Sequence, residues 1–229
     1  MEDLTFVNKG IYVNETLIIS DLHIGYEAYL NNKGVLMPRV HFEKQKNELI
    51  DLLKKLKPKR VILNGDIKHE FGIINSQEWK DTIELIKIIK TVADLIIIKG
   101  NHDKVTDIIA EVENIKVIEY YLLDDIYICH GDFIPSKIDK NINTIIIGHE
   151  HPAFILKDEA KSEKYKCFIK TKYHEKDLYV LPSFNLVNEG VDVSSFKFMS
   201  PFLKGVKELE VLIYMDGTLF DFGKIYKAK

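Results

Sequence analysis

The chain has 229 residues, of which 46% are hydrophobic, and its formal net charge is -3. This length fits a single domain over residues 1–229 with enough apolar material for a large core. The slightly negative charge excludes a global positive field that attracts nucleic acid, and two cysteines exclude a disulfide framework. The apolar runs are too short to cross a bilayer and the acidic N-terminus lacks a signal-peptide pattern, so we expect a cytoplasmic protein without a membrane partner.

The predicted elements begin with a β-hairpin, because Leu4–Val7 and Ile11–Val13 flank a turn-forming Asn-Lys-Gly sequence. Strands and helices then alternate along the chain. Amphipathic periodicity predicts helices over Phe42–Leu56, Ser76–Val92 and Asp103–Val112. The intervening strands are short, β-branched and almost continuously apolar, which is typical of strands covered on both faces. These strands are Leu17–Ser20, Val61–Leu63, Leu95–Ile98, Ile126–Cys129 and Thr144–Ile147.

The C-terminal part of the chain is predicted to be antiparallel. Tyr165–Thr171 and Leu178–Leu181 flank a polar turn, and Val211–Met215 and Leu219–Phe222 flank an Asp-Gly turn. The Lys-rich stretch Lys157–Lys176 is interpreted as a solvated hairpin. Strand–helix alternation followed by hairpins favours an α/β protein with two packed mixed sheets and helices outside.

Side chains that bind metal ions follow each of the five predicted strands. Ligand sites in open α/β sheets lie beyond the carboxyl ends of the strands, so we expect these groups to meet. Imidazoles and carboxylates with one amide oxygen suit Mn²⁺, Fe²⁺ or Zn²⁺, and the set is large enough for two ions that share a carboxylate. The absence of a thiolate cluster argues against a structural zinc site. The residues are Asp21, His23, Asp66, Asn101, His102, His130, His149 and His151.

The order of these motifs resembles the signature of the calcineurin-like metallophosphoesterases over roughly residues 15–155. The motifs are Asp21-Leu22-His23, Gly65-Asp66, Gly100-Asn101-His102-Asp103, His130 and Gly148-His149-Glu150-His151. The compact length, the Gly65-Asp66-x-x-His69 motif and the Pro182-Ser183-Phe184-Asn185 motif resemble the SbcD-related archaeal phosphoesterases. The longer SbcD nucleases carry a DNA-binding cap, and we expect no cap domain in these 229 residues.

The resemblance implies a four-layer αββα sandwich with two mixed β-sheets. It also implies that two divalent metal ions are bound, with manganese expected and iron, nickel, cobalt or zinc as alternatives. His102 is expected to face the scissile phosphate and to act as the general acid rather than to bind metal. Asp66 is expected to bridge the two ions. The implied ligands of the first ion are Asp21, His23 and His151, and those of the second are Asn101, His130 and His149.

The expected activity is hydrolysis of a phosphodiester, in a nucleotide or in nucleic acid, by a water that two metal ions activate. One alternative is a phosphoesterase of small metabolites or cyclic nucleotides. The other is a non-catalytic scaffold of the same fold, but the presence of every implied ligand and of His102 favours catalysis. The native metal, the preference for monoesters or diesters and the oligomeric state stay open.

Three further features have two readings each. His69 is a candidate for binding the substrate phosphate, with a supporting or surface role as the alternative. Asp103 is a candidate for orienting His102, with another acidic group as the alternative. The Gly25–Pro38 loop contains Tyr26 and Tyr29, which either stack on a base or pack within the loop, and loop packing is slightly favoured.

Overall fold

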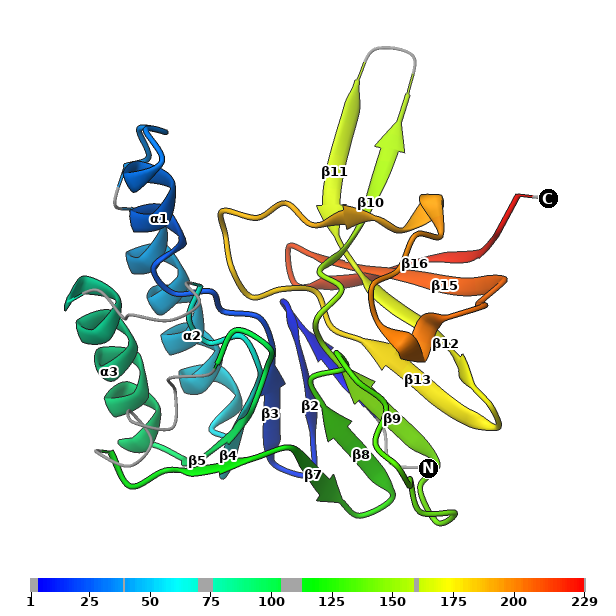
Figure 1. Ribbon diagram of the computed structural model, residues 1–229, viewed down its shortest axis with the longest axis horizontal. Helices are drawn as coiled ribbons and strands as arrows, with labels where there is room; N and C mark the ends of the chain where they lie inside the picture. The colour runs from blue at the N-terminus through cyan, green and yellow to red at the C-terminus, as the bar shows by residue number, and fades with distance from the viewer. Residues whose placement is uncertain (1–3, 39, 70–75, 104–112, 159–160, 229) are drawn as a thin grey trace.

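The computed structural model describes residues 4–38, 40–69, 76–103, 113–158 and 161–228 (Figure 1). Its first sheet has six strands in sequence order, β1-β2-β3-β4-β5-β6. The first three strands form antiparallel pairs, and β3 to β6 run parallel. The bounds are β1 Thr5–Val7, β2 Gly10–Val13, β3 Thr16–Ile19, β4 Arg60–Asn64, β5 Asp94–Ile98 and β6 Lys116–Ile118.

The second sheet has seven strands in the order β16-β15-β12-β13-β9-β8-β7, and its central strands β8, β9 and β13 run parallel. A third, three-stranded sheet has the order β11-β10-β14, and its β10–β11 hairpin projects from the top of the molecule in Figure 1. The bounds in the second sheet are β7 Tyr120–Leu123, β8 Ile126–Cys129, β9 Thr144–Ile147, β12 Phe168–Tyr173, β13 Lys176–Val180, β15 Glu208–Met215 and β16 Thr218–Tyr226. Those in the third are β10 Pro152–Lys157, β11 Ser162–Lys166 and β14 Val191–Asp192.

In the described parts of the chain, three α-helices lie on the outer side of the first sheet (Figure 1). They are α1 Tyr26–Asn32, α2 His41–Leu56 and α3 Ser76–Lys90. Two single-turn 3-10 helices, η1 Val193–Ser195 and η2 Pro201–Leu203, contribute apolar side chains to the core on the other side of the second sheet.

The alternation of side chains along the strands explains the layers. Leu17 and Ile19 of β3 pack against α2 and α3, whereas Ile18 points into the core between the two sheets. In β9, Ile146 faces this central core, and Ile145 faces the outer core that contains η1 and η2. The strands are therefore apolar on both faces, as the sequence predicts, and the predicted α/β fold with two mixed sheets is confirmed.

The predicted helices over Phe42–Leu56 and Ser76–Val92 correspond to α2 and α3, which end within two residues of the predicted bounds. The helix predicted over Asp103–Val112 lies outside the described residues except for Asp103. In the parts of the chain that the structure describes, no helix is both long and apolar enough to pass through a membrane.

Two predictions for the C-terminal part were wrong. Tyr165–Thr171 is not one strand, because Cys167 is buried and its backbone N–H donates to the carbonyl of Pro152. At this point the chain leaves the third sheet and enters the second. The stretch Lys157–Lys176 is accordingly not one hairpin, since it runs through β11 and β12, which belong to different sheets.

Candidate metal centre

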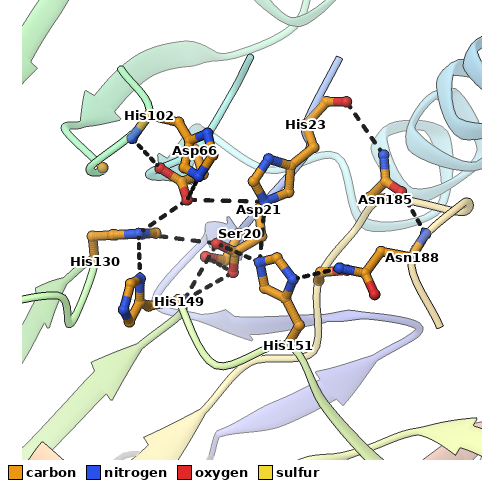
Figure 2. A network of polar contacts seen from close by, with 12 residues as sticks. Ser20, Asp21, His23, Asp66, His102, His130, His149, His151, Asn185 and Asn188 are labelled. Atoms are coloured by element: carbon orange, nitrogen blue, oxygen red, sulfur yellow. Dashed lines mark hydrogen bonds and ion pairs between the residues drawn. The ribbon is translucent and has the colours of Figure 1, made fainter. Parts of the chain in front are cut away.

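The carboxyl ends of strands from both sheets converge on one group of polar side chains, which Figure 2 shows pointing toward one another. Asp21 is fully buried, and His130, Asp66 and His23 are between 1% and 5% exposed. Buried ionisable groups at this density need compensating charges. The candidates follow β3 (Asp21, His23), β4 (Asp66), β5 (Asn101, His102), β8 (His130) and β9 (His149, His151).

The first group of potential ligand atoms comes from Asp21, His23 and His151, whose atoms all lie within 4.8 Å of one another. The Nε2 atoms of His23 and His151 are 3.1 Å apart, and His151 Nε2 is 3.2 Å from Asp21 Oδ1. Two imidazole nitrogens and a carboxylate oxygen thus face one point.

The second group comes from Asp66, His130 and His149, again within 4.8 Å. His130 Nε2 lies 3.4 Å from Asp66 Oδ2 and 3.2 Å from His149 Nδ1. The amide oxygen of Asn101 is also 3.2 Å from His130 Nε2, so this residue joins the same group.

Asp66 lies between the two groups. Its Oδ2 is 3.4 Å from His130 Nε2 on one side and 3.9 Å from His23 Nε2 on the other. Its Oδ1 accepts a hydrogen bond of 2.9 Å from the backbone N–H of His102. The structure therefore brings together all seven candidate ligands, with His102 beside them.

Glycines in the motifs allow this close approach. A Cβ atom on Gly148 would lie 1.8 Å from Ser20 Oγ and 2.7 Å from Asp21 Oδ2. A Cβ atom on Gly100 would lie 2.3 Å from Asp66 Oδ1. Each glycine thus makes room for a candidate ligand that a different strand carries, which ties the motifs to one another in space.

The backbone is strained at five of the seven candidate ligands, because they adopt positive φ without being glycine. Such conformations cost of order 1–3 kcal/mol each and cluster at functional sites. The five residues are Asp21 (φ 56), His23 (φ 44), Asp66 (φ 47), His149 (φ 69) and His151 (φ 47).

The charges of the site favour a bound cation. Burial lowers the pKa of His23 to about 3, with the charge of His151 as the next cause, so His23 is neutral and able to ligate a metal. Burial also opposes a charge on His130, but the hydrogen bond and charge of Asp66, with the charge of Asp21, raise the pKa of His130 to about 10. The two carboxylates thus hold a positive charge in this pocket.

His102 is held in one orientation by a backbone carbonyl. Its Nδ1 lies 2.7 Å from the carbonyl oxygen of His69, so Nδ1–H donates to it, and Nε2 lies 4.0 Å from Asp66 Oδ2. Asp103, the sequence-based candidate for this role, accepts from the backbone N–H groups of Ile67 and Gly100 at 3.0 Å each. Asp103 therefore connects the loops after β4 and β5, and the His69 carbonyl contacts the ring.

The His69 ring lies beside the candidate metal ligands. It is 5.4 Å from the ring of His23 and 5.8 Å from that of His102, measured between centroids. Its Nδ1 is buried and has no hydrogen-bond partner in the described residues. Burial, followed by the charge of His102, lowers the pKa of His69 to about 4.

Sequence reasoning missed the role of the segment after β13. Asn185 Nδ2 donates to the carbonyl oxygens of Leu22 (3.0 Å) and His23 (3.3 Å), and Asn188 Nδ2 lies 2.9 Å from His151 Nδ1 (Figure 2). These contacts fix two candidate ligands of the first group. The Pro182-Ser183-Phe184-Asn185 motif was the available signal, but nothing in it indicated which residues it would contact.

The ammonium group of Lys166 supports this segment from β11. Its Nζ donates to Ser183 Oγ at 2.7 Å and to the carbonyl oxygen of Ser183 at 2.9 Å, and it also donates to the carbonyl oxygen of Asn185. Burial lowers the pKa of Lys166 to about 7, with the charge of Lys9 as the next cause.

The site combines buried imidazoles and carboxylates with an amide oxygen at the strand ends of two packed mixed sheets. This combination is typical of metal-dependent hydrolases. The donor set fits divalent ions of borderline to hard character. A family model described as calcineurin-like phosphoesterase matches residues 15–193. The chain belongs to the calcineurin-like phosphoesterase family, and it is a hydrolase that acts on phosphate esters.

One solved structure with a TM-score above 0.5 agrees with this fold. The nuclease MPE of Pseudomonas putida superposes with a TM-score of 0.68 at 18% sequence identity, over 96% of this chain and 100% of that one. Yfce, a phosphoesterase from E. coli, gives a TM-score of 0.42 at 12% identity over 93% of this chain and 99% of that one. No curated protein matched the sequence.

Proposed function

We propose that the protein hydrolyses phosphodiesters of nucleotides or nucleic acid with two divalent metal ions, preferentially manganese. The observation that carries this proposal is that two groups of ligand atoms meet at Asp66, next to an oriented His102. In this proposal Asp66 bridges the ions. Asp21, His23 and His151 hold the first ion, and Asn101, His130 and His149 hold the second.

Two divalent cations in these positions would neutralise the phosphate oxygens and lower the pKa of a water enough to give hydroxide near neutral pH. The proton for the leaving group comes from a side chain. With Nδ1–H donated to the carbonyl of His69, the doubly protonated ring of His102 presents Nε2–H on the side of Asp66. A hydroxide derived from water would form the new P–O bond as the bond to the leaving oxygen breaks. The electron pair of the broken bond goes to the leaving oxygen, and that oxygen takes the Nε2 proton of His102.

A phosphodiester carries one negative charge, whereas a phosphomonoester is a dianion that needs more positive charge for binding. The scarcity of guanidinium groups therefore supports a diester substrate. The sequence contains two arginines, Arg39 and Arg60. Arg60 begins β4, at the end of the strand opposite to Asp66, and lies over the ring of Tyr121. Arg39 lies outside the described residues. Arg60 is therefore not placed to clamp a phosphate through two hydrogen bonds beside Asp66.

His69 is proposed as a contact to the substrate phosphate. Potential ligand atoms of His23, His69 and His102 lie within 4.8 Å of one another. The buried Nδ1 of His69, which no described residue satisfies, supports a partner that arrives with the substrate. The structurally similar P. putida protein is named a nuclease, which supports nucleic acid as the substrate class.

The test is a substrate panel with Mn²⁺: a dinucleotide, bis(4-nitrophenyl) phosphate, 4-nitrophenyl phosphate and a cyclic nucleotide. We expect hydrolysis of both open-chain diesters at a higher rate than the monoester, and its loss on chelation. Asp66→Ala should abolish hydrolysis, whereas Asp51→Ala, which removes an exposed carboxylate on α2, should not. Exclusive hydrolysis of the cyclic nucleotide would instead support the small-metabolite activity, and a metal-loaded but inactive protein would support a scaffold.

A further inference from the structure

Two tyrosines and a histidine form a continuous aromatic wall next to the candidate metal centre. The ring centroids of Tyr26 and His69 are 4.1 Å apart, and those of Tyr29 and His69 are 4.8 Å apart. The two tyrosine rings are themselves 6.2 Å apart and nearly parallel, at 28°. Both tyrosines keep part of their surface exposed. The aromatic wall, defined as Tyr26, Tyr29 and His69, is thus accessible.

The backbone ties this wall to the site. Tyr26 is the first residue of α1, three positions after His23, and its N–H donates to the His23 carbonyl at 3.2 Å. His69 belongs to the loop after β4, and its N–H donates to the carbonyl of Ile24 at 3.0 Å. The positions of the rings relative to the candidate ligands are therefore set by main-chain hydrogen bonds.

The position of the acid decides which part of a substrate meets the wall. His102 must touch the leaving oxygen to protonate it, so the leaving group lies on the His102 side of the phosphate. Two rings flank His102: the candidate ligand His23 at 5.1 Å, and His69 at 5.8 Å and 27°, with Tyr26 packed against His69 at 4.1 Å. A leaving group that extends away from the phosphate along these rings meets the aromatic wall.

A cavity of about 200 Å³ opens beside the wall and is lined by Tyr26, His23 and Phe42, among others. It is smaller than the roughly 300–1,000 Å³ of most ligand sites, so it suits one ring system rather than a whole nucleotide. Four acidic residues also line it, and their negative charge disfavours a phosphate group in the cavity. They are Glu27, Glu43, Glu78 and Asp81.

We propose that the aromatic wall and this cavity bind the base of the nucleoside that leaves, which makes Tyr26 and Tyr29 specificity-determining residues for dinucleotides and polynucleotides. The inference rests on the proposed function and adds to it the side of the phosphate on which a base is recognised. Bases stack on tyrosine whatever their identity, because each has a π-face. The subsite therefore selects for the presence of a base, and the alcohol product is a nucleoside or a chain that ends in one.

The test uses three dinucleotides: the complete molecule, one without the base on the leaving side, and one without the base on the retained side. Tyr26→Ala should lower kcat/KM about 5- to 150-fold for the complete molecule and for the one that lacks the retained-side base, which corresponds to the loss of one stack. It should leave the molecule without the leaving-side base almost unchanged. Tyr26→Phe should behave as the wild type.

Tyr120→Ala is the matched control, because Tyr120 is 45% exposed and stacks on Tyr127 at 4.9 Å, but belongs to β7 and lies outside the wall. It should affect none of the three substrates. Tyr29→Ala repeats the test with an independent variant. An equal loss on all three substrates, or no loss on any, overturns the inference, since the tyrosines then serve packing alone. A wild-type protein that hydrolyses none of the three overturns the proposed function, and the inference with it.

Discussion

Replacing Gly100 with alanine tests how tightly the motifs are packed against one another. The added Cβ would lie 2.3 Å from Asp66 Oδ1 and 2.4 Å from the backbone nitrogen of Asp66. Because one of these atoms belongs to the main chain, rotation of the Asp66 side chain does not relieve the contact. The φ angle of Gly100 lies outside the left-handed region, so alanine brings no backbone strain of its own.

The expected effect follows from the displacement. Asp66 must move by about 1 Å to reach ordinary van der Waals contact, and a metal or catalytic group tolerates about 0.5 Å. A misplacement of about 1 Å costs roughly 100-fold in rate. We therefore expect Gly100→Ala to bind fewer than two manganese ions per chain and to lose at least about 100-fold in kcat/KM. Asp66 Oδ1 also accepts from the His102 N–H, so the acid is displaced as well.

The assay combines elemental analysis of the manganese-loaded protein after gel filtration with hydrolysis of a dinucleotide. Gly205→Ala is the control, because Gly205 has φ +82 and nothing within 4 Å of an added Cβ. This variant loses roughly 1–2 kcal/mol of stability from left-handed strain but keeps its metal and its rate. Wild-type metal content and turnover in Gly100→Ala would refute the idea that this glycine makes room for Asp66.

Three other predictions follow. His102→Ala should retain both metals and lose about 10²–10⁴-fold in kcat on a dinucleotide. The loss should be far smaller on bis(4-nitrophenyl) phosphate, because its leaving group needs no proton. Equal losses of kcat on both substrates in steady-state kinetics would count against an acid role. A metal on Nε2 of His151 leaves the proton on Nδ1, so the Asn188 amide must then turn its oxygen toward Nδ1. Asn188→Leu should weaken metal binding at the first site about 10- to 100-fold in titration calorimetry, whereas Asn188→Asp, which also supplies an oxygen, should not. Equal affinities in both variants would argue against a role in orienting His151. The free energy of unfolding of the metal-free protein, measured in urea, should fall as the pH falls from 6.5 toward 4. The cause is that His69 binds a proton in the unfolded chain in this pH range but resists it in the folded state. His69→Gln should make the free energy of unfolding depend less on pH, and an unchanged dependence would contradict the lowered pKa.

The fold and the candidate ligands were predictable because their signals are local. Runs such as Val61–Leu63 are apolar at every position, and both of their faces are buried in the structure. Ligand-type residues directly follow such runs, and parallel strands in one sheet bring their carboxyl ends together. Candidate ligands such as Asp66 and His130 could therefore be proposed from their positions after strands, without knowledge of the tertiary contacts.

The supporting contacts were not predictable, since they join residues far apart in sequence. Asn185 reaches the carbonyl of Leu22 because the segment after β13 pairs with the end of β3. Lys166 of β11 reaches the carbonyl of Asn185 in the same segment. The change of sheet at Cys167 also has no local signal, because the residues on either side both have strand character. The contact between His102 and the carbonyl of His69 was likewise not predictable, because it depends on the course of the loop after β4.

The most direct test of the central claim is the anomalous scattering of manganese-soaked crystals. Two peaks about 3.5–4 Å apart are expected, both in contact with Asp66, with His102 nearby but not bound to either. The first should also contact Asp21, His23 and His151, and the second Asn101, His130 and His149. A single peak, or peaks away from Asp66, would contradict the account.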